Sequence, residues 1–210
     1  MMQQLQSTPF YHFIRNIYVK WDQRKEFNAW KKKGKGGSSP HILKQKIIRE
    51  FSNNNNLKTL VETGTYRGDM VEAMKKYFNK IYSIELDKEL YRKAKNRFNN
   101  QKKISIKQGD SSNVLKNIIP LLSEPAIFWL DGHYSAGVTA KGEKETPILE
   151  ELNVILNESR LSHILLIDDA RLFGVDRNYP SIKKLSQFIK EQRAEAIISV
   201  KDDIIRVVLN

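Results

Sequence analysis

Five stretches of the chain run from apolar residues into acidic or polar side chains that could take part in chemistry. In chain order they end in Glu62 and Thr63, Glu85, Asp110 and Ser111, Asp131 with His133, and Asp168 and Asp169. Ligands in open α/β sheets bind beyond the carboxyl ends of the strands, so acids that follow successive strands should share one edge. Any single acid could be a helix N-cap or a turn residue. Five acids at the ends of successive strands favour a functional site at that edge of the sheet.

The sharpest signal is a set of three carboxylates. Asp131 follows the apolar residues 128–130, and Asp168 and Asp169 follow the apolar residues 165–167. The two strands should be neighbours, and carboxylates meeting at one edge would repel unless a cation neutralised them. Oxygen ligands favour a hard ion, and we expect Mg²⁺, with Mn²⁺ or Ca²⁺ as alternatives.

Such an ion could bind a substrate hydroxyl and lower its pKa. Asp131 or His133 could then remove the proton. For His133, an ordinary loop histidine in contact with backbone is the competing interpretation. The residues therefore predict chemistry at a hydroxyl oxygen.

Residues 57–69 are the stretch around which these acids would be organised. Apolar residues give way to Gly64 and Gly68, and apolar residues at helical spacing follow. Strand, glycine turn and helix is the geometry that points backbone N–H groups at an anionic or polar ligand. Glu85 lies 23 residues after Glu62, an offset that suits an acid binding ribose hydroxyls. The glycine spacing does not match the dinucleotide fingerprint.

Hydrophobic patterning predicts the elements that position these residues. Strands and helices alternate, which predicts an α/β fold with a mainly parallel seven-stranded sheet and helices on both faces. The chain ends in a hairpin pattern, so the last strand should be antiparallel. Strands are predicted at 57–63, 80–86, 103–108, 125–131, 162–168, 194–200 and 203–209. Helices are predicted at 41–51, 68–78, 87–99, 111–122, 147–157 and 180–192.

The glycine stretch resembles the first motif of class I S-adenosylmethionine methyltransferases, in which Glu62, Gly64 and Gly68 fit and Tyr66 replaces a common middle glycine. With the Trp-Leu-Asp-Gly and Ile-Asp-Asp stretches, residues 57–190 resemble the metal-dependent sugar O-methyltransferases of the macrocin and novobiocin type. The resemblance implies a Rossmann-like methyltransferase fold and S-adenosylmethionine as cofactor. Metal ligands would be Asp131, Asp168 and Asp169. Cofactor contacts would come from Glu62, Thr63, Gly64, Gly68, Glu85, Asp110 and Ser111.

Composition limits the classes of protein further. The chain has 210 residues, no cysteine and a net charge of +12, so a disulfide framework and a cysteine nucleophile are excluded. Neither a membrane-spanning apolar run nor a secretory signal is visible, and we expect a cytoplasmic protein. The positive charge makes nucleic acid a candidate partner. Residues 1–39 carry half of it, and a solvated basic surface is the favoured interpretation.

Residues 1–39 are expected to be an N-terminal extension, made of a helix and a linker, before a catalytic domain at 40–210. Phe10, Ile14, Ile17 and Trp21 recur at helical intervals between basic residues. Such a helix could lie on an anionic membrane through residues 10–35, cover the catalytic domain, or pair with a second copy in a homodimer. Packing on protein is the favoured interpretation.

The function that these observations predict is a methyltransferase that moves the methyl group of S-adenosylmethionine to a hydroxyl of a sugar, glycan precursor or related small molecule, with Mg²⁺ assistance. One alternative is an RNA methyltransferase, which the positive charge supports. Another is a non-enzymatic member of the fold, recruited to a membrane or complex through its N-terminus. An NAD-binding oxidoreductase is disfavoured by the turn spacing.

Overall fold

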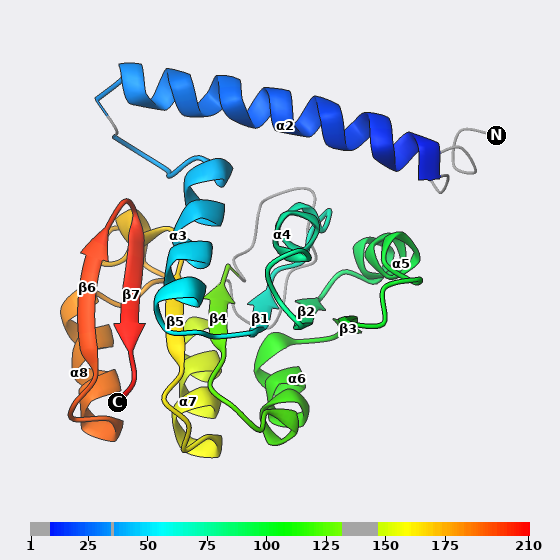
Figure 1. Ribbon diagram of the computed structural model, residues 1–210. Helices are drawn as coiled ribbons and strands as arrows, with labels where there is room; N and C mark the ends of the chain where they lie inside the picture. Colours follow the sequence, from blue (N-terminus) through cyan, green and yellow to red (C-terminus); the bar gives the residue numbers. More distant parts are fainter. Residues whose placement is uncertain (1–8, 35, 132–146) are drawn as a thin grey trace.

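Seven strands form a single sheet in this computed structural model, which describes residues 9–34, 36–131 and 147–210. The strands are β1 (Thr59–Thr63), β2 (Lys80–Glu85), β3 (Ile104–Gln108), β4 (Ile127–Leu130), β5 (Ile164–Ile167), β6 (Ile197–Lys201) and β7 (Ile204–Val208). Their order is β3-β2-β1-β4-β5-β7-β6 (Figure 1). The first five strands pair in parallel, and β7 is antiparallel to both of its neighbours. The predicted fold class and antiparallel final strand are confirmed.

Helices cover both faces of this sheet. The helices are α2 (Pro9–Lys32), α3 (His41–Asn54), α4 (Asp69–Met74), α5 (Lys88–Arg97), α6 (Ser111–Ile118), α7 (Ile148–Glu158) and α8 (Ile182–Gln192), with short 3-10 turns η1 (Ile119–Leu121) and η2 (Ala170–Leu172). One buried cluster joins α3 and α4 to the sheet, and a second joins α6, α7 and α8 to the other face. Every helix predicted between residues 41 and 192 is present, with ends that differ by a few residues.

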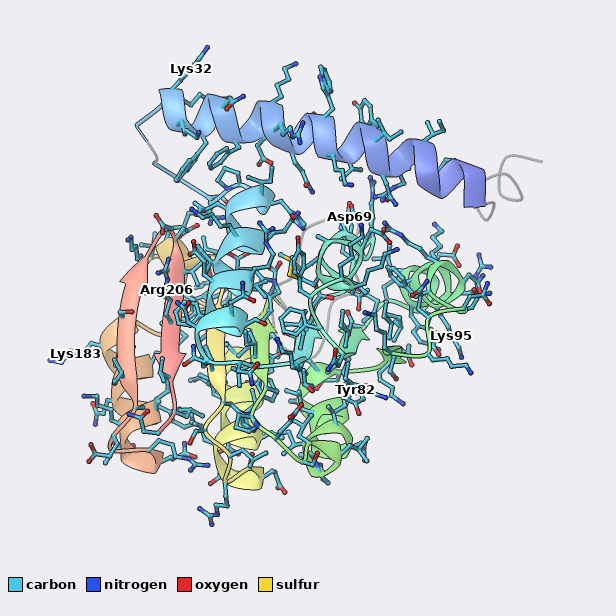
Figure 2. All side chains as sticks on the ribbon, viewed as in Figure 1. Lys32, Asp69, Tyr82, Lys95, Lys183 and Arg206 are labelled. Atoms are coloured by element: carbon cyan, nitrogen blue, oxygen red, sulfur yellow. The ribbon has the colours of Figure 1, made fainter. Side chains whose placement is uncertain are left out.

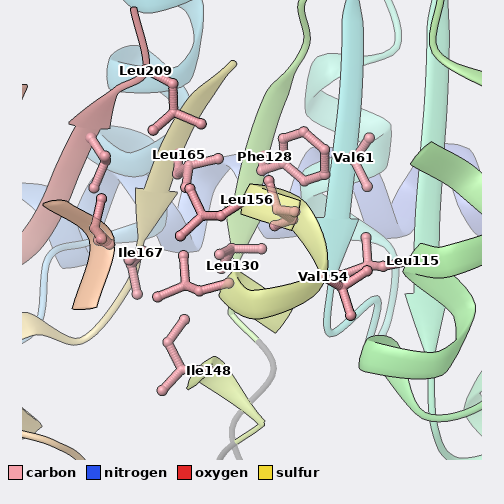
Figure 3. Close-up of a cluster of buried hydrophobic side chains, with 14 of the residues drawn as sticks. Val61, Leu115, Phe128, Leu130, Ile148, Val154, Leu156, Leu165, Ile167 and Leu209 are labelled. Carbon is pink, nitrogen blue, oxygen red and sulfur yellow. The ribbon is translucent and has the colours of Figure 1, made fainter. Parts of the chain in front are cut away.

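The alternation of side chains along each strand builds these two core clusters, because successive residues of a strand point to opposite faces. Leu60 and Trp129 join the α3 and α4 side. Val61 and Phe128 join the α6, α7 and α8 side, where Figure 3 shows Phe128 among aliphatic side chains from the sheet and its helices. A sheet buried on both faces holds the carboxyl ends of β1, β2, β4 and β5 at one rigid edge.

Helix α2 lies outside the sheet and its covering helices, across the ends of α3 and α4 (Figure 1). Arg15 binds both carboxylate oxygens of Asp69 at 2.5 and 2.8 Å, and Asn16 donates to Glu72 at 3.2 Å. Ile14, Ile17 and Trp21 are exposed, so these three side chains do not pack against the rest of the protein. None of the described helices is long and apolar enough to cross a membrane.

Candidate functional site

The turn after β1 has a backbone that suits glycine. Gly64 and Gly68 adopt φ angles of 83° and 72°, in the left-handed region. A Cβ on Gly68 would lie 2.7 Å from Cε2 of Phe98, so both backbone conformation and space require glycine there. Tyr66 also has a positive φ of 49°. The turn therefore holds a residue with a side chain in the left-handed region as well.

The backbone N–H groups of this turn were expected to face a ligand, and most of them instead bind the protein. The N–H groups of Gly64 and Thr65 both donate to the carbonyl of Ile84 at 3.0 Å. That of Gly68 donates to Thr65 at 2.8 Å, and that of Tyr66 donates to Glu85. The turn is thus fastened to β2, and its contribution to a ligand site would be close approach rather than a row of free donors.

Glu85 ends β2 directly beside this turn. Its carboxylate accepts the N–H groups of Tyr66 at 2.6 Å and Asp87 at 2.9 Å. Burial raises the pKa of Glu85, while these backbone donors act to lower it. Each carboxylate oxygen has a second lone pair, so Glu85 can still accept hydrogen bonds from a diol. The backbone donors fix the position of its carboxylate.

Glu62 behaves differently from Glu85, because its side chain is buried within the protein. The Ser83 hydroxyl donates to it at 2.5 Å, and Thr65 contacts Ser83 at 2.5 Å. Burial raises the pKa of Glu62 to about 8, against the lowering effect of Ser83. At neutral pH this carboxyl is therefore mainly protonated, and it links β1 to β2 through hydrogen bonds.

Asp110 and Ser111 lie where α6 begins, as expected for residues after β3. The Asp110 carboxylate caps the helix by accepting the N–H of Asn113 at 3.3 Å and the hydroxyl of Ser112 at 2.5 Å. The helix-capping interpretation of this acid is therefore correct. Its charge also acts on a buried acid of α7, Glu151.

A further acid, Glu151 on α7, was not singled out from the sequence. It is buried, and burial raises its pKa to about 7 against the lowering effect of the nearby hydroxyls of Ser111 and Thr63. Within the described residues, its Oε1 atom has no hydrogen-bond partner. The sequence does indicate that Glu151 is buried, because Glu151 lies three residues after Ile148 and four before Ile155, on the buried face of the helix.

The three predicted metal ligands do meet. Asp131, at the end of β4, and Asp168 and Asp169, after β5, each place a carboxylate oxygen within 4.8 Å of the others. Strand pairing explains this, because β4 and β5 are parallel neighbours and the N–H of Asp168 donates to the Leu130 carbonyl at 3.0 Å. Asp169 adopts a φ of 58°, an uncommon left-handed conformation for an acid that turns the chain into η2.

A cation fits this cluster. Asp168 is buried, and among the described residues its Oδ1 atom has no hydrogen-bond partner. Burial and then the charge of Asp131 raise the pKa of Asp168 to about 7. A buried oxygen without a donor is the atom that a hard cation would bind, and three carboxylates are a suitable donor set for Mg²⁺.

Two basic side chains already reach the cluster, and sequence reasoning missed both. The Lys44 ammonium, from α3, binds Oδ2 of Asp168, and Arg171 binds Asp169 at 2.5 Å and also contacts Asp203. Burial lowers the pKa of Lys44, but Asp168 and Asp131 outweigh it and raise the value. The protein therefore supplies part of the neutralising charge itself.

His133, the other candidate for proton removal, lies outside the described residues. The candidate residues that are described lie at the carboxyl ends of β1, β2, β4 and β5, in the glycine turn between β1 and α4, or at the start of α6. That edge joins the glycine turn, the Glu85 carboxylate and the three-carboxylate cluster.

Comparisons with known proteins agree with this architecture. No protein-family model and no curated protein matches the chain. Solved structures do. The Bacillus cereus O-methyltransferase in complex with SAH aligns with a TM-score of 0.58 at 13% identity, over 90% of each chain.

Two further structures are similar. TomG of Streptomyces achromogenes is an O-methyltransferase involved in tomaymycin synthesis, and its structure contains SAM. It aligns with a TM-score of 0.57 at 15% identity, over 89% of this chain and 88% of TomG. SAH-bound PaMTH1 of Podospora anserina aligns with a TM-score of 0.57 at 16% identity, over 93% of this chain and 88% of PaMTH1. At such identities the likeness shows the fold alone: the chain has the Rossmann-like methyltransferase fold.

Proposed function

We propose that this protein is an S-adenosylmethionine-dependent O-methyltransferase that acts on a hydroxyl of a sugar, glycan precursor or related small molecule, with Mg²⁺ assistance. The observation that carries the proposal is the three-carboxylate cluster, whose buried Asp168 Oδ1 lacks a partner among the described residues. It lies at the same sheet edge as Glu85 and the glycine turn. O-methyltransferases are among the proteins that share the fold.

Cofactor binding would rest on the elements around β1 and β2. The Glu85 carboxylate, held by the N–H groups of Tyr66 and Asp87, would accept hydrogen bonds from the ribose hydroxyls. The backbone at Gly64 and Gly68 would allow close approach of the cofactor. Thr63, Asp110 and Ser111 would line the same pocket from β1 and α6, and Glu62 would support it from behind through Ser83.

Methyl transfer is an in-line displacement in which the acceptor oxygen forms a bond to the methyl carbon while the bond from that carbon to sulfur breaks. The chain must hold donor and acceptor in line and take the hydroxyl proton. Asp131, Asp168 and Asp169 would hold Mg²⁺, which when bound lowers the pKa of the acceptor hydroxyl. Asp131 or His133 would accept that proton. Lys44 would keep the Asp168 carboxylate in place.

The experiment that tests this function is a transfer assay with methyl-labelled S-adenosylmethionine. Sugars, nucleotide sugars and RNA are offered in parallel, with added Mg²⁺ or with EDTA. We expect label on a sugar hydroxyl, lost with EDTA and in Asp168→Asn but kept in Asp22→Asn, which alters an exposed acid of α2. Label on RNA alone would support the RNA alternative, and label that is insensitive to EDTA would refute the metal role.

A further inference from the structure

The side of α2 that faces away from the domain carries four large apolar side chains. Ile14, Ile17, Tyr18 and Trp21 are exposed by 50%, 55%, 63% and 59%. Their spacing of three, four and seven residues places them on one helical face, and we name them the outward stripe. Contiguous apolar surface of this kind marks an interaction site more often than an isolated exposed residue does.

The opposite face of α2 is fixed to the domain by polar contacts. Arg15 forms its ion pair with Asp69, Arg97 donates to Asn16 at 3.0 Å, and the Gln23 amide contacts the ring of His41 at 2.9 Å. Arg97 also binds Asp69 at 2.9 Å. Turning the stripe inward would break these contacts, so the domain holds the stripe toward the outside.

Basic residues follow the stripe along the same helix. Residues 24–33, the basic segment, contain five Lys or Arg and one Glu, a net charge of +4. The five basic side chains are exposed, and Figure 2 shows Lys32 pointing away from the domain. Lys25 lies over the ring of Trp21 at 5.5 Å, which joins the basic segment to the outward stripe. Exposed aromatic side chains are suited to the headgroup level of a membrane, and a cluster of Lys and Arg beside them is attracted to anionic lipids.

Charge decides between a lipid surface and a second copy of the chain. An antiparallel pair of α2 helices centred on the outward stripe would set residues 24–26, where the basic segment begins, opposite residues 9–11 of the other copy, which contain no Asp or Glu. A parallel pair would set the basic segments against each other. Four side chains are also few for a stable dimer, which uses about 20–30 residues on each side.

We propose that α2 docks this protein on an anionic lipid surface, with the outward stripe inserted at the headgroup level and the basic segment on the lipid phosphates. The inference does not depend on the proposed function. It has a geometric consequence, because Asp69, which anchors α2, begins α4 immediately after the glycine turn. Docking through α2 would therefore hold the candidate site edge near the lipid surface.

Co-sedimentation of the full chain with vesicles tests the proposal. Phosphatidylcholine vesicles with and without phosphatidylglycerol are compared at low and high salt. We expect binding only when phosphatidylglycerol is present, weakened by salt. The triple variant Ile14→Ser, Ile17→Ser, Trp21→Ser should bind more than about tenfold more weakly, and Lys25→Gln, Lys31→Gln, Lys32→Gln roughly 100-fold more weakly, since each basic residue adds about fivefold.

A matched control removes three exposed lysines from α8, as Lys183→Gln, Lys184→Gln, Lys190→Gln. This variant has the same net charge as the α2 lysine variant and should bind as the unaltered protein does. Equal loss in both variants, or no binding to phosphatidylglycerol, would overturn the proposal. So would a dimer in lipid-free solution that the stripe variant dissociates, since the stripe would then be an interface between copies.

Discussion

Lys44 reaches from α3 to the carboxylate of Asp168, at the end of β5, and forms an ion pair that is almost entirely buried. Helix α3 precedes the sheet in the chain, so this pair ties the helix to the acidic cluster that the later strands build. Lys44 Nζ also lies 5.9 Å from the centre of the Trp129 ring. The cluster is thus held by a basic residue of the protein as well as by strand pairing.

Removing Lys44 should destabilise the fold, because Asp168 would stay buried without its ion-pair partner. Lys44→Met leaves Asp168 buried without its cation and should lower the free energy of unfolding by about 3 kcal/mol, as for other broken buried pairs. The matched control is Lys46→Met, because Lys46 is exposed on the same helix. Urea unfolding with and without Mg²⁺ measures both. Added Mg²⁺ should recover part of the loss in Lys44→Met, and equal stability of the two variants would contradict the structural role.

The second prediction concerns the effect on stability of replacing Gly68 in the glycine turn. Gly68→Ala requires an L-residue at a φ of 72° and a Cβ 2.7 Å from the Phe98 ring, which should destabilise the fold by roughly 2–3 kcal/mol. Gly36→Ala is the control, because a Cβ there meets nothing within 4 Å. Thermal unfolding compares the two. If Gly68→Ala unfolded at the temperature of Gly36→Ala, the close packing of the turn on Phe98 would be wrong.

Glu62 predicts a pH dependence of stability. Its pKa is about 8 in the folded protein and near the ordinary 4.5 when unfolded, so the stabilisation is complete below 4.5 and is lost as pH rises through 8. Glu62→Gln cannot ionise and can still accept the Ser83 hydroxyl. Between pH 5 and pH 9 the variant should therefore gain roughly 3–5 kcal/mol relative to the unaltered protein. If the free energies of unfolding of Glu62→Gln and of the unaltered protein changed equally with pH, the raised pKa of Glu62 would be refuted. Glu50→Gln, which removes an exposed acid of α3, controls for the loss of a surface charge.

Much of the fold could be predicted from the sequence because each strand is apolar, short and bounded by turns or acids. The stretches that became β4 and β5 are examples, since each has four consecutive buried residues. Their pairing placed Asp131 beside Asp168 and Asp169, as predicted. Alternating strands and helices fix the direction of such strands, and a terminal hairpin must add an antiparallel one.

Other features depend on tertiary contacts that periodicity does not specify. Lys44 lies three residues before Ile47 and four before Ile48, on the buried face of α3, yet only the packing of that helix brings it to Asp168. The free N–H groups expected at the glycine turn are bound to β2 for the same reason. The outward stripe of α2 looked like a packing face by its spacing. The polar contacts of Arg15, which no pattern predicts, turn that stripe outward. The roles given to individual site residues stay predictions.

Titration calorimetry with S-adenosylhomocysteine tests directly whether the protein binds the cofactor at the end of β2. We expect micromolar binding by the unaltered protein and a loss of at least about tenfold in Glu85→Gln, where an amide replaces an oxygen that accepts hydrogen bonds. Glu89→Gln, an exposed acid on α5, should bind like the unaltered protein. No heat of binding from a folded protein, or equal affinity in Glu85→Gln, would contradict a cofactor site at the end of β2.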